Sequence, residues 1–184
     1  MPDLPFHDRL RAIQPVTHGG KNQLASKGVD PTQFDDFSAN ILPIETPAEV
    51  AAAIAASDPA AYPDPNCTAL RGAIAVHQGL PADHVLCANG SIALIAAVAQ
   101  SCLSEHDCAV VVGPTFGEYA AAIEVTGAAV VHARTTSIDD VLACIDNHRP
   151  ALVFVCNPNN PTGHLWSAEA IDRIAAAAPL VLDE

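Results

Sequence analysis

The feature that most constrains this chain is a regular alternation of short apolar runs and longer amphipathic segments after residue 84. The apolar runs, rich in β-branched residues, lie at residues 84–87, 109–112, 129–132, 151–156 and 180–182. The segments with helical periodicity lie at residues 91–103, 117–126, 138–148 and 167–177. Continuously apolar strands that alternate with helices indicate a parallel sheet covered on both faces. The sequence therefore predicts an α/β fold.

The part of the chain before residue 84 has a different character. Residues 1–45 contain frequent glycine and proline, so we expect loops there. Thr46-Pro47-Ala48-Glu49 predicts a capping box at the start of a helix that runs to about residue 57. A second helix is predicted over residues 68–78, ending at Gly79. We divide the chain into an N-terminal arm with substrate-side loops, residues 1–45, and part of a large domain, residues 46–184.

Composition excludes several classes of function. The formal net charge is −13 and only two lysines occur, Lys21 and Lys27, so neither nucleic acid nor an anionic membrane surface is an expected partner. No apolar run approaches the roughly 20 residues that span a bilayer. The six cysteines form no C-x-x-C pair, so we expect buried, reduced thiols and a cytoplasmic location. The eight histidines are scattered along the chain, so we expect no metal site.

Four polar motifs come directly after predicted strands. They are Asn89-Gly90-Ser91, the segment 113–119 with Phe116, the segment 157–163 and Asp183. Ligands of open α/β sheets bind at the carboxyl ends of the strands, which makes these motifs candidates for one site. Taken singly, each has a structural alternative: a capped turn, a core aromatic residue or a helix cap.

The segment 157–163 reads Asn-Pro-Asn-Asn-Pro-Thr-Gly, and it follows one apolar strand while Asp183-Glu184 ends the next. In this respect the chain resembles the class I/II aminotransferase superfamily of pyridoxal 5'-phosphate (PLP) enzymes, over essentially its whole length. The resemblance implies the large domain of PLP fold type I, a mostly parallel sheet with helices on both faces. It also implies PLP as the cofactor.

The resemblance implies a role for each motif. Gly90-Ser91-Ile92 would bind the cofactor phosphate, although Ile92 stands where an acidic or hydroxyl residue is common. Phe116 would stack on the pyridine ring, and Asn157 would donate to the oxygen of its 3-hydroxyl group. Asp183 would pair with the protonated ring nitrogen, so that the ring can accept electrons from the substrate's α-carbon.

Other residues bear on the partner and the substrate. Tyr62 matches a tyrosine that reaches the phosphate bound by a neighbouring subunit, which implies a homodimer. His18-Gly19-Gly20 and Asn40 are similar to substrate-binding segments of L-threonine-O-3-phosphate decarboxylases of cobalamin biosynthesis, close relatives of histidinol-phosphate aminotransferases. Leu42-Pro43 departs from the usual Asn-Pro of that pattern. We therefore expect an enzyme that acts on a phosphorylated amino acid.

One element of the family is missing from these 184 residues. The superfamily needs a lysine that binds the cofactor covalently, and neither Lys21 nor Lys27 matches its motif. We therefore expect an N-terminal portion of a longer enzyme, truncated at residue 184 and inactive alone. Threonine-phosphate decarboxylation is the leading hypothesis for the activity of that enzyme. Transamination of histidinol phosphate and a non-catalytic aminotransferase-like binding module are the alternatives.

Overall fold

The computed structural model describes residues 44–184, together with residues 10, 11, 13, 16, 27–33, 35, 40 and 42. These residues fall into two compact units. One holds residues 88–184 and the described residues up to Val16; the other holds the described residues from 27 to Cys87. The division into residues 1–45 and 46–184 stays a prediction.

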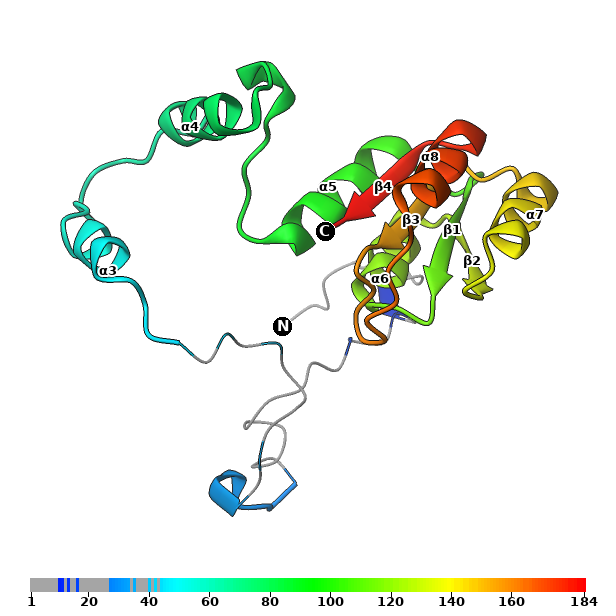
Figure 1. Ribbon diagram of the computed structural model, residues 1–184, viewed down its shortest axis with the longest axis horizontal. Helices are drawn as coiled ribbons and strands as arrows, with labels where there is room; N and C mark the ends of the chain where they lie inside the picture. Colours follow the sequence, from blue (N-terminus) through cyan, green and yellow to red (C-terminus); the bar gives the residue numbers. More distant parts are fainter. Residues whose placement is uncertain are drawn as a thin grey trace, which may run out of the picture. The chain divides into compact units, whose positions relative to one another are not determined.

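A four-stranded, entirely parallel sheet forms the centre of the unit that contains residues 88–184 (Figure 1). Its strands are β1 (Cys108–Gly113), β2 (Ala129–Arg134), β3 (Leu152–Cys156) and β4 (Leu180–Asp183), in the order β2-β1-β3-β4. Val110 of β1 pairs with Val131 on one side and Val153 on the other. All five residues of β3 are buried, as expected for an inner strand covered on both faces.

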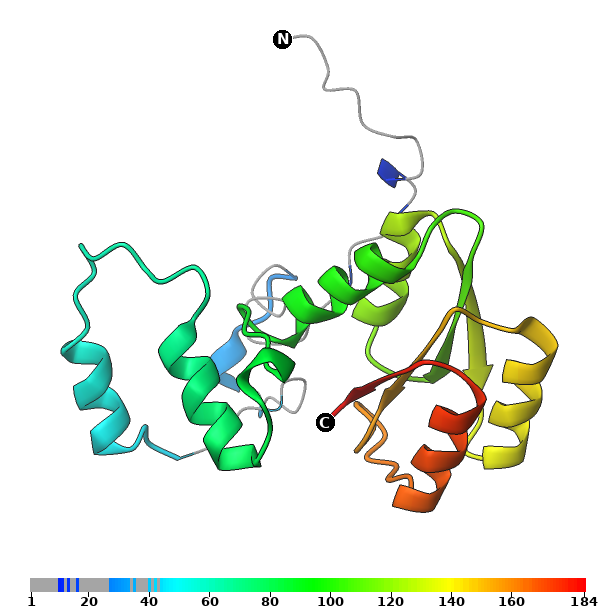
Figure 2. The same cartoon turned by 90° about the horizontal axis from the view of Figure 1, so that it is seen from above.

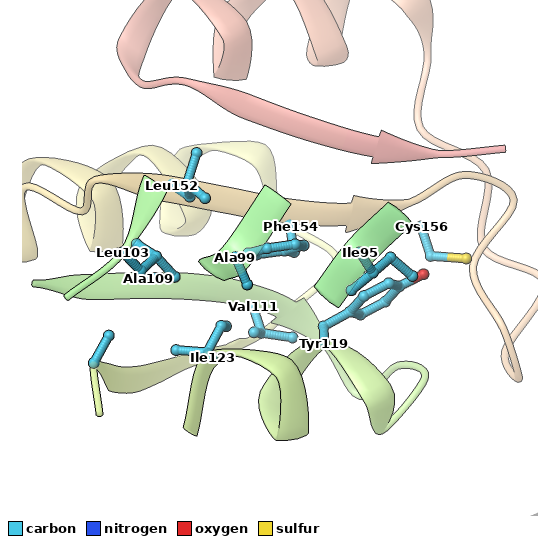
Figure 3. Close-up of a cluster of buried hydrophobic side chains, with 11 residues drawn as sticks. Ile95, Ala99, Leu103, Ala109, Val111, Tyr119, Ile123, Leu152, Phe154 and Cys156 are labelled. Atoms are coloured by element: carbon cyan, nitrogen blue, oxygen red, sulfur yellow. The ribbon is translucent and has the colours of Figure 1, made fainter. Parts of the chain in front are cut away.

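Four helices cover this sheet, two on each face (Figure 2). They are α5 (Ser91–Cys102), α6 (Glu118–Thr126), α7 (Ile138–His148) and α8 (Ala168–Ala177). Because successive strand residues point to opposite faces, Val111 and Phe154 pack under α5 and α6, whereas Val110 and Val153 pack under α7 and α8. Figure 3 shows the first of these two clusters. The predicted α/β architecture is confirmed.

The other unit contains the helices α3 (Ala48–Ala55) and α4 (Thr68–Gln78) and the short 3-10 helices η1 (Pro31–Gln33) and η2 (Ala82–His84). The end of α4 is as predicted, because Gly79 adopts φ 67°, a left-handed conformation that glycine tolerates. The predicted capping box of α3 is wrong. Pro47 is the N-cap and no side chain caps the helix, which begins at Ala48.

Two further expectations are corrected. The predicted strand at residues 84–87 is wrong: Val85 is extended, with φ −112° and ψ 126°, but no strand in the described part of the chain pairs with it. An apolar run becomes a strand only where a neighbour completes its hydrogen bonds. All six cysteines are free thiols, but only Cys156 is buried, and Cys102 at the end of α5 is exposed.

None of the helices in the described part of the chain is both long and apolar enough to cross a membrane. Nor do three or more potential metal ligands gather anywhere among these residues.

Candidate functional site

Three of the four polar motifs predicted from the sequence, those at the ends of β1, β3 and β4, meet at the carboxyl edge of the sheet. The fourth, Asn89-Gly90-Ser91, follows no strand in the described part of the chain. Because all strands are parallel, the chain after β1, β3 and β4 leaves the sheet at the same edge (Figure 1). The backbone N–H of Asn157 donates to the carbonyl oxygen of Asp183 at 2.8 Å, which joins the ends of β3 and β4. Asn159 donates from Nδ2 to the carbonyl oxygen of Pro114 at 2.9 Å, which joins the loops after β3 and β1.

The Asp183 carboxylate is held by Tyr119, a residue in the first turn of α6. The Tyr119 hydroxyl donates to Asp183 Oδ2 at 2.5 Å. The tyrosine ring is 1% exposed and lies edge-on to Phe116, with centroids 5.7 Å apart, and stacked on Phe154 at 5.8 Å. Burial first, and then the hydrogen bond to Asp183, raise the pKa of Tyr119 far above its ordinary value. The phenol therefore stays protonated and acts as a donor.

Tyr119 is a part of the site that the sequence analysis missed. Figure 3 shows its hydroxyl oxygen beside the Cys156 sulfur, at the end of the buried cluster where the strands finish. The available signal was the spacing of Phe116 and Tyr119, which are three residues apart where a strand passes into a helix. That spacing brings both rings to the edge of the sheet.

The side chain of Asn157 binds the backbone of Trp166, at the far end of the loop that follows β3. Its Oδ1 accepts a hydrogen bond from the backbone N–H of Trp166 at 2.7 Å, and its Nδ2 donates to the Trp166 carbonyl oxygen at 3.3 Å. These two bonds fix the orientation of the amide. An amide nitrogen carries two hydrogens, so one N–H of Asn157 remains for a ligand.

Asn159 has a structural role within the same loop. It is buried, with 9% of its surface exposed. Besides Pro114, its Nδ2 donates to Thr162 Oγ1 at 2.7 Å, while its backbone N–H donates to the His164 carbonyl oxygen at 2.8 Å. Asn159 therefore determines the path of the segment 157–163.

The N-terminus of α5 is suited to an anion. Ser137 and Ser167 cap α7 and α8 with their side chains, whereas no side chain caps α5. Its N-cap Gly90 has φ 77°, which a residue with a side chain rarely adopts, and an added Cβ there would meet no atom within 4 Å. The N–H groups of Ser91 and Ile92 make no backbone hydrogen bond to the described residues, so they can bind a phosphate at the positive end of the helix.

The family described as aminotransferase class I and II matches residues 33–184. The chain belongs to this family. Histidinol-phosphate aminotransferase of Sphingopyxis alaskensis is 37% identical over 163 residues, which cover 84% of this chain and 44% of that protein. This aminotransferase-family chain thus spans less than half the length of that relative.

Solved structures with a similar fold include the following two. Histidinol-phosphate aminotransferase of Sinorhizobium meliloti, solved with PLP, superposes with a TM-score of 0.76 and 23% identity over 98% of this chain and 50% of that chain. L-threonine-O-3-phosphate decarboxylase of Porphyromonas gingivalis superposes with a TM-score of 0.59 and 25% identity over 66% of this chain and 39% of that one. The first likeness confirms the predicted PLP fold type I architecture.

The predicted site residues of this aminotransferase-family chain fall into three groups. Phe116, Asn157 and Asp183 lie in one connected set of contacts, made by Tyr119 and by the bond between Asn157 and Asp183. Gly90, Ser91 and Ile92 belong to the same unit, at the start of α5. The structure does not bring the others into this set: Tyr62 and Asn40 are exposed residues of the second unit, and His18, Gly19 and Gly20 lie outside the described residues.

Proposed function

We propose that this chain is part of a PLP-dependent enzyme with the chemistry of an aminotransferase. The observation that carries the proposal is the Asp183 carboxylate, fixed at the carboxyl end of β4 by Tyr119. Its Oδ2 accepts that bond, while Oδ1 has no hydrogen-bond partner among the described residues. A carboxylate with one fixed and one open oxygen suits a protonated ring nitrogen.

The other residues fit the same cofactor. The uncapped start of α5 at Gly90-Ser91-Ile92 would bind the phosphate. The remaining N–H of Asn157 would donate to the 3-hydroxyl oxygen, and Phe116 would pack on the ring. When bound, PLP supplies an electron-accepting ring for reactions at the α-carbon of an amino acid. The task of Asp183 is to hold a proton on the ring nitrogen, and that of Phe116 is to exclude water from one face of the ring.

For the substrate we propose histidinol phosphate with 2-oxoglutarate as the amino acceptor. The support is the S. alaskensis relative, named for that activity and 37% identical over most of this chain. Threonine-phosphate decarboxylation is the second candidate. Its support is the P. gingivalis structure, which covers 66% of the chain, together with His18-Gly19-Gly20 and Asn40.

An assay of two products separates these candidates. The protein expressed from its full reading frame is given histidinol phosphate with 2-oxoglutarate, and separately threonine phosphate alone, while glutamate and CO2 are measured. We expect glutamate from the first mixture and no CO2 from the second. CO2 from threonine phosphate without glutamate formation would establish the decarboxylase instead. Neither product, from a protein that binds PLP, would indicate a binding module.

We further propose a homodimer in which Tyr62 reaches the phosphate bound by the partner subunit. Tyr62 is 92% exposed within the segment Tyr62-Pro63-Asp64-Pro65, so its hydroxyl is available to a second chain. Sedimentation equilibrium of the wild-type protein gives the assembly state. A Tyr62→Phe variant that keeps this state but binds PLP less tightly would support the assignment.

The 184-residue polypeptide itself offers a test of covalent attachment. After incubation with PLP and borohydride reduction, we expect no stoichiometric label at a single lysine, because Lys21 and Lys27 both precede the helices and strands of the candidate site. Peptide mapping by mass spectrometry measures the label. One lysine labelled to completion would show that an N-terminal residue performs this role.

A further inference from the structure

Packing alone does not explain the hydroxyl group of Tyr119. The ring fills a space between Phe116 and Phe154 in an otherwise apolar cluster, and phenylalanine would fill that space as well. A buried hydroxyl costs free energy unless it is hydrogen-bonded. Here the bond goes to the carboxylate of Asp183, which is 64 residues distant in the sequence.

The bond has two physical consequences for the carboxylate. First, it fixes the rotation of the Asp183 side chain, because Oδ2 accepts from the Tyr119 hydroxyl and the Tyr119 ring is itself held between Phe116 and Phe154. Second, because Oδ2 is occupied by Tyr119, Oδ1 is the oxygen that remains for a ligand at the edge of the sheet. Because burial raises the pKa of Tyr119, its hydroxyl keeps the proton that it donates to Oδ2.

We propose that Tyr119 is a positioning residue, which fixes the orientation of the Asp183 carboxylate and so holds Oδ1 in place for the protonated ring nitrogen of the cofactor. This inference rests on the proposed function. Its neighbour Cys156 does not replace it, because the Cys156 thiol donates to the carbonyl oxygen of Pro158 at 3.2 Å. Tyr119 thereby links the residue that packs on the ring, Phe116, to the residue that holds the ring's charge.

The test uses the holoenzyme from the full reading frame, loaded with PLP labelled with ¹⁵N in the ring. The ring-nitrogen chemical shift reports its protonation directly and does not depend on turnover. In Tyr119→Phe we expect the shift to move toward the unprotonated value and kcat to fall about ten- to a hundredfold, the range of a hydrogen bond to a charged group. Thr126→Val is the matched control, because it removes another hydroxyl from α6, one bonded to the Ile123 carbonyl oxygen at 2.7 Å.

A third variant keeps the proposal testable if Tyr119→Phe folds poorly. Tyr119 replaced by 4-aminophenylalanine retains a donor at the same place, and we expect it to restore the wild-type shift. An unchanged shift in Tyr119→Phe, or one that 4-aminophenylalanine fails to restore, would overturn the proposal. Asp183→Asn separates the role of Tyr119 from that of Asp183. If the ring-nitrogen shift is unchanged in Asp183→Asn as well, the proposed role of Asp183 is wrong. If the shift moves in Asp183→Asn but not in Tyr119→Phe, only the proposed role of Tyr119 is wrong.

Discussion

Replacing Asp183 with asparagine is expected to lower kcat about 100- to 1000-fold while PLP stays bound. The neutral amide cannot hold a proton on the ring nitrogen, and the loss of one preorganised electrostatic contact costs about 3–4 kcal/mol of transition-state stabilisation. The amide oxygen can still accept from Tyr119, so the local structure is preserved. Steady-state kinetics and the absorbance of bound cofactor measure the two effects separately.

The adjacent residue provides the control for this prediction. Glu184 is exposed, and Glu184→Gln removes a carboxylate one position away without touching the Tyr119 bond. We expect it to change kcat by less than about twofold, as for a solvated surface charge. Equal turnover in wild type and Asp183→Asn would mean that Asp183 merely ends β4 and has no catalytic role.

Much of the sheet unit could be predicted because its signals are local and mutually consistent. The helix predicted over residues 138–148 coincides with α7, whose start is fixed by Ser137 accepting a hydrogen bond from the Asp140 N–H. The run at 151–156 became the fully buried β3 because its residues suit both faces of a covered sheet. Residues 84–87 carry a similar apolar pattern but do not pair with any described strand, and periodicity contains no information about partners.

The candidate site was predictable in its location and not in its connections. Strand ends in a parallel sheet share an edge, so Phe116, Asn157 and Asp183 could be grouped from their positions in the sequence. The bond from Tyr119 to Asp183 and the bond from Asn159 to Pro114 span 64 and 45 residues. Such pairs depend on the register and packing of the folded chain, which neither the residues of a motif nor their spacing specifies.

The segment 157–163 illustrates the same limit with two neighbouring amides. Asn159 and Asn160 are the same residue type in adjacent positions, and nothing in the sequence distinguishes them. In the structure Asn159 is buried and joins two loops, whereas Asn160 is exposed and its side chain has no hydrogen bond among the described residues.

Asn159→Ala is therefore expected to lower the free energy of unfolding by about 2–3 kcal/mol, because it removes two side-chain hydrogen bonds and deprives the Pro114 carbonyl oxygen of its donor. Asn160→Ala is the matched control and should change stability by less than about 0.5 kcal/mol. Urea denaturation of both variants measures the difference. Equal losses would show that the loops after β1 and β3 are held independently of Asn159. A loss confined to Asn159→Ala, with weaker PLP binding, would show that this amide keeps Asn157 and Phe116 in place at the edge of the sheet.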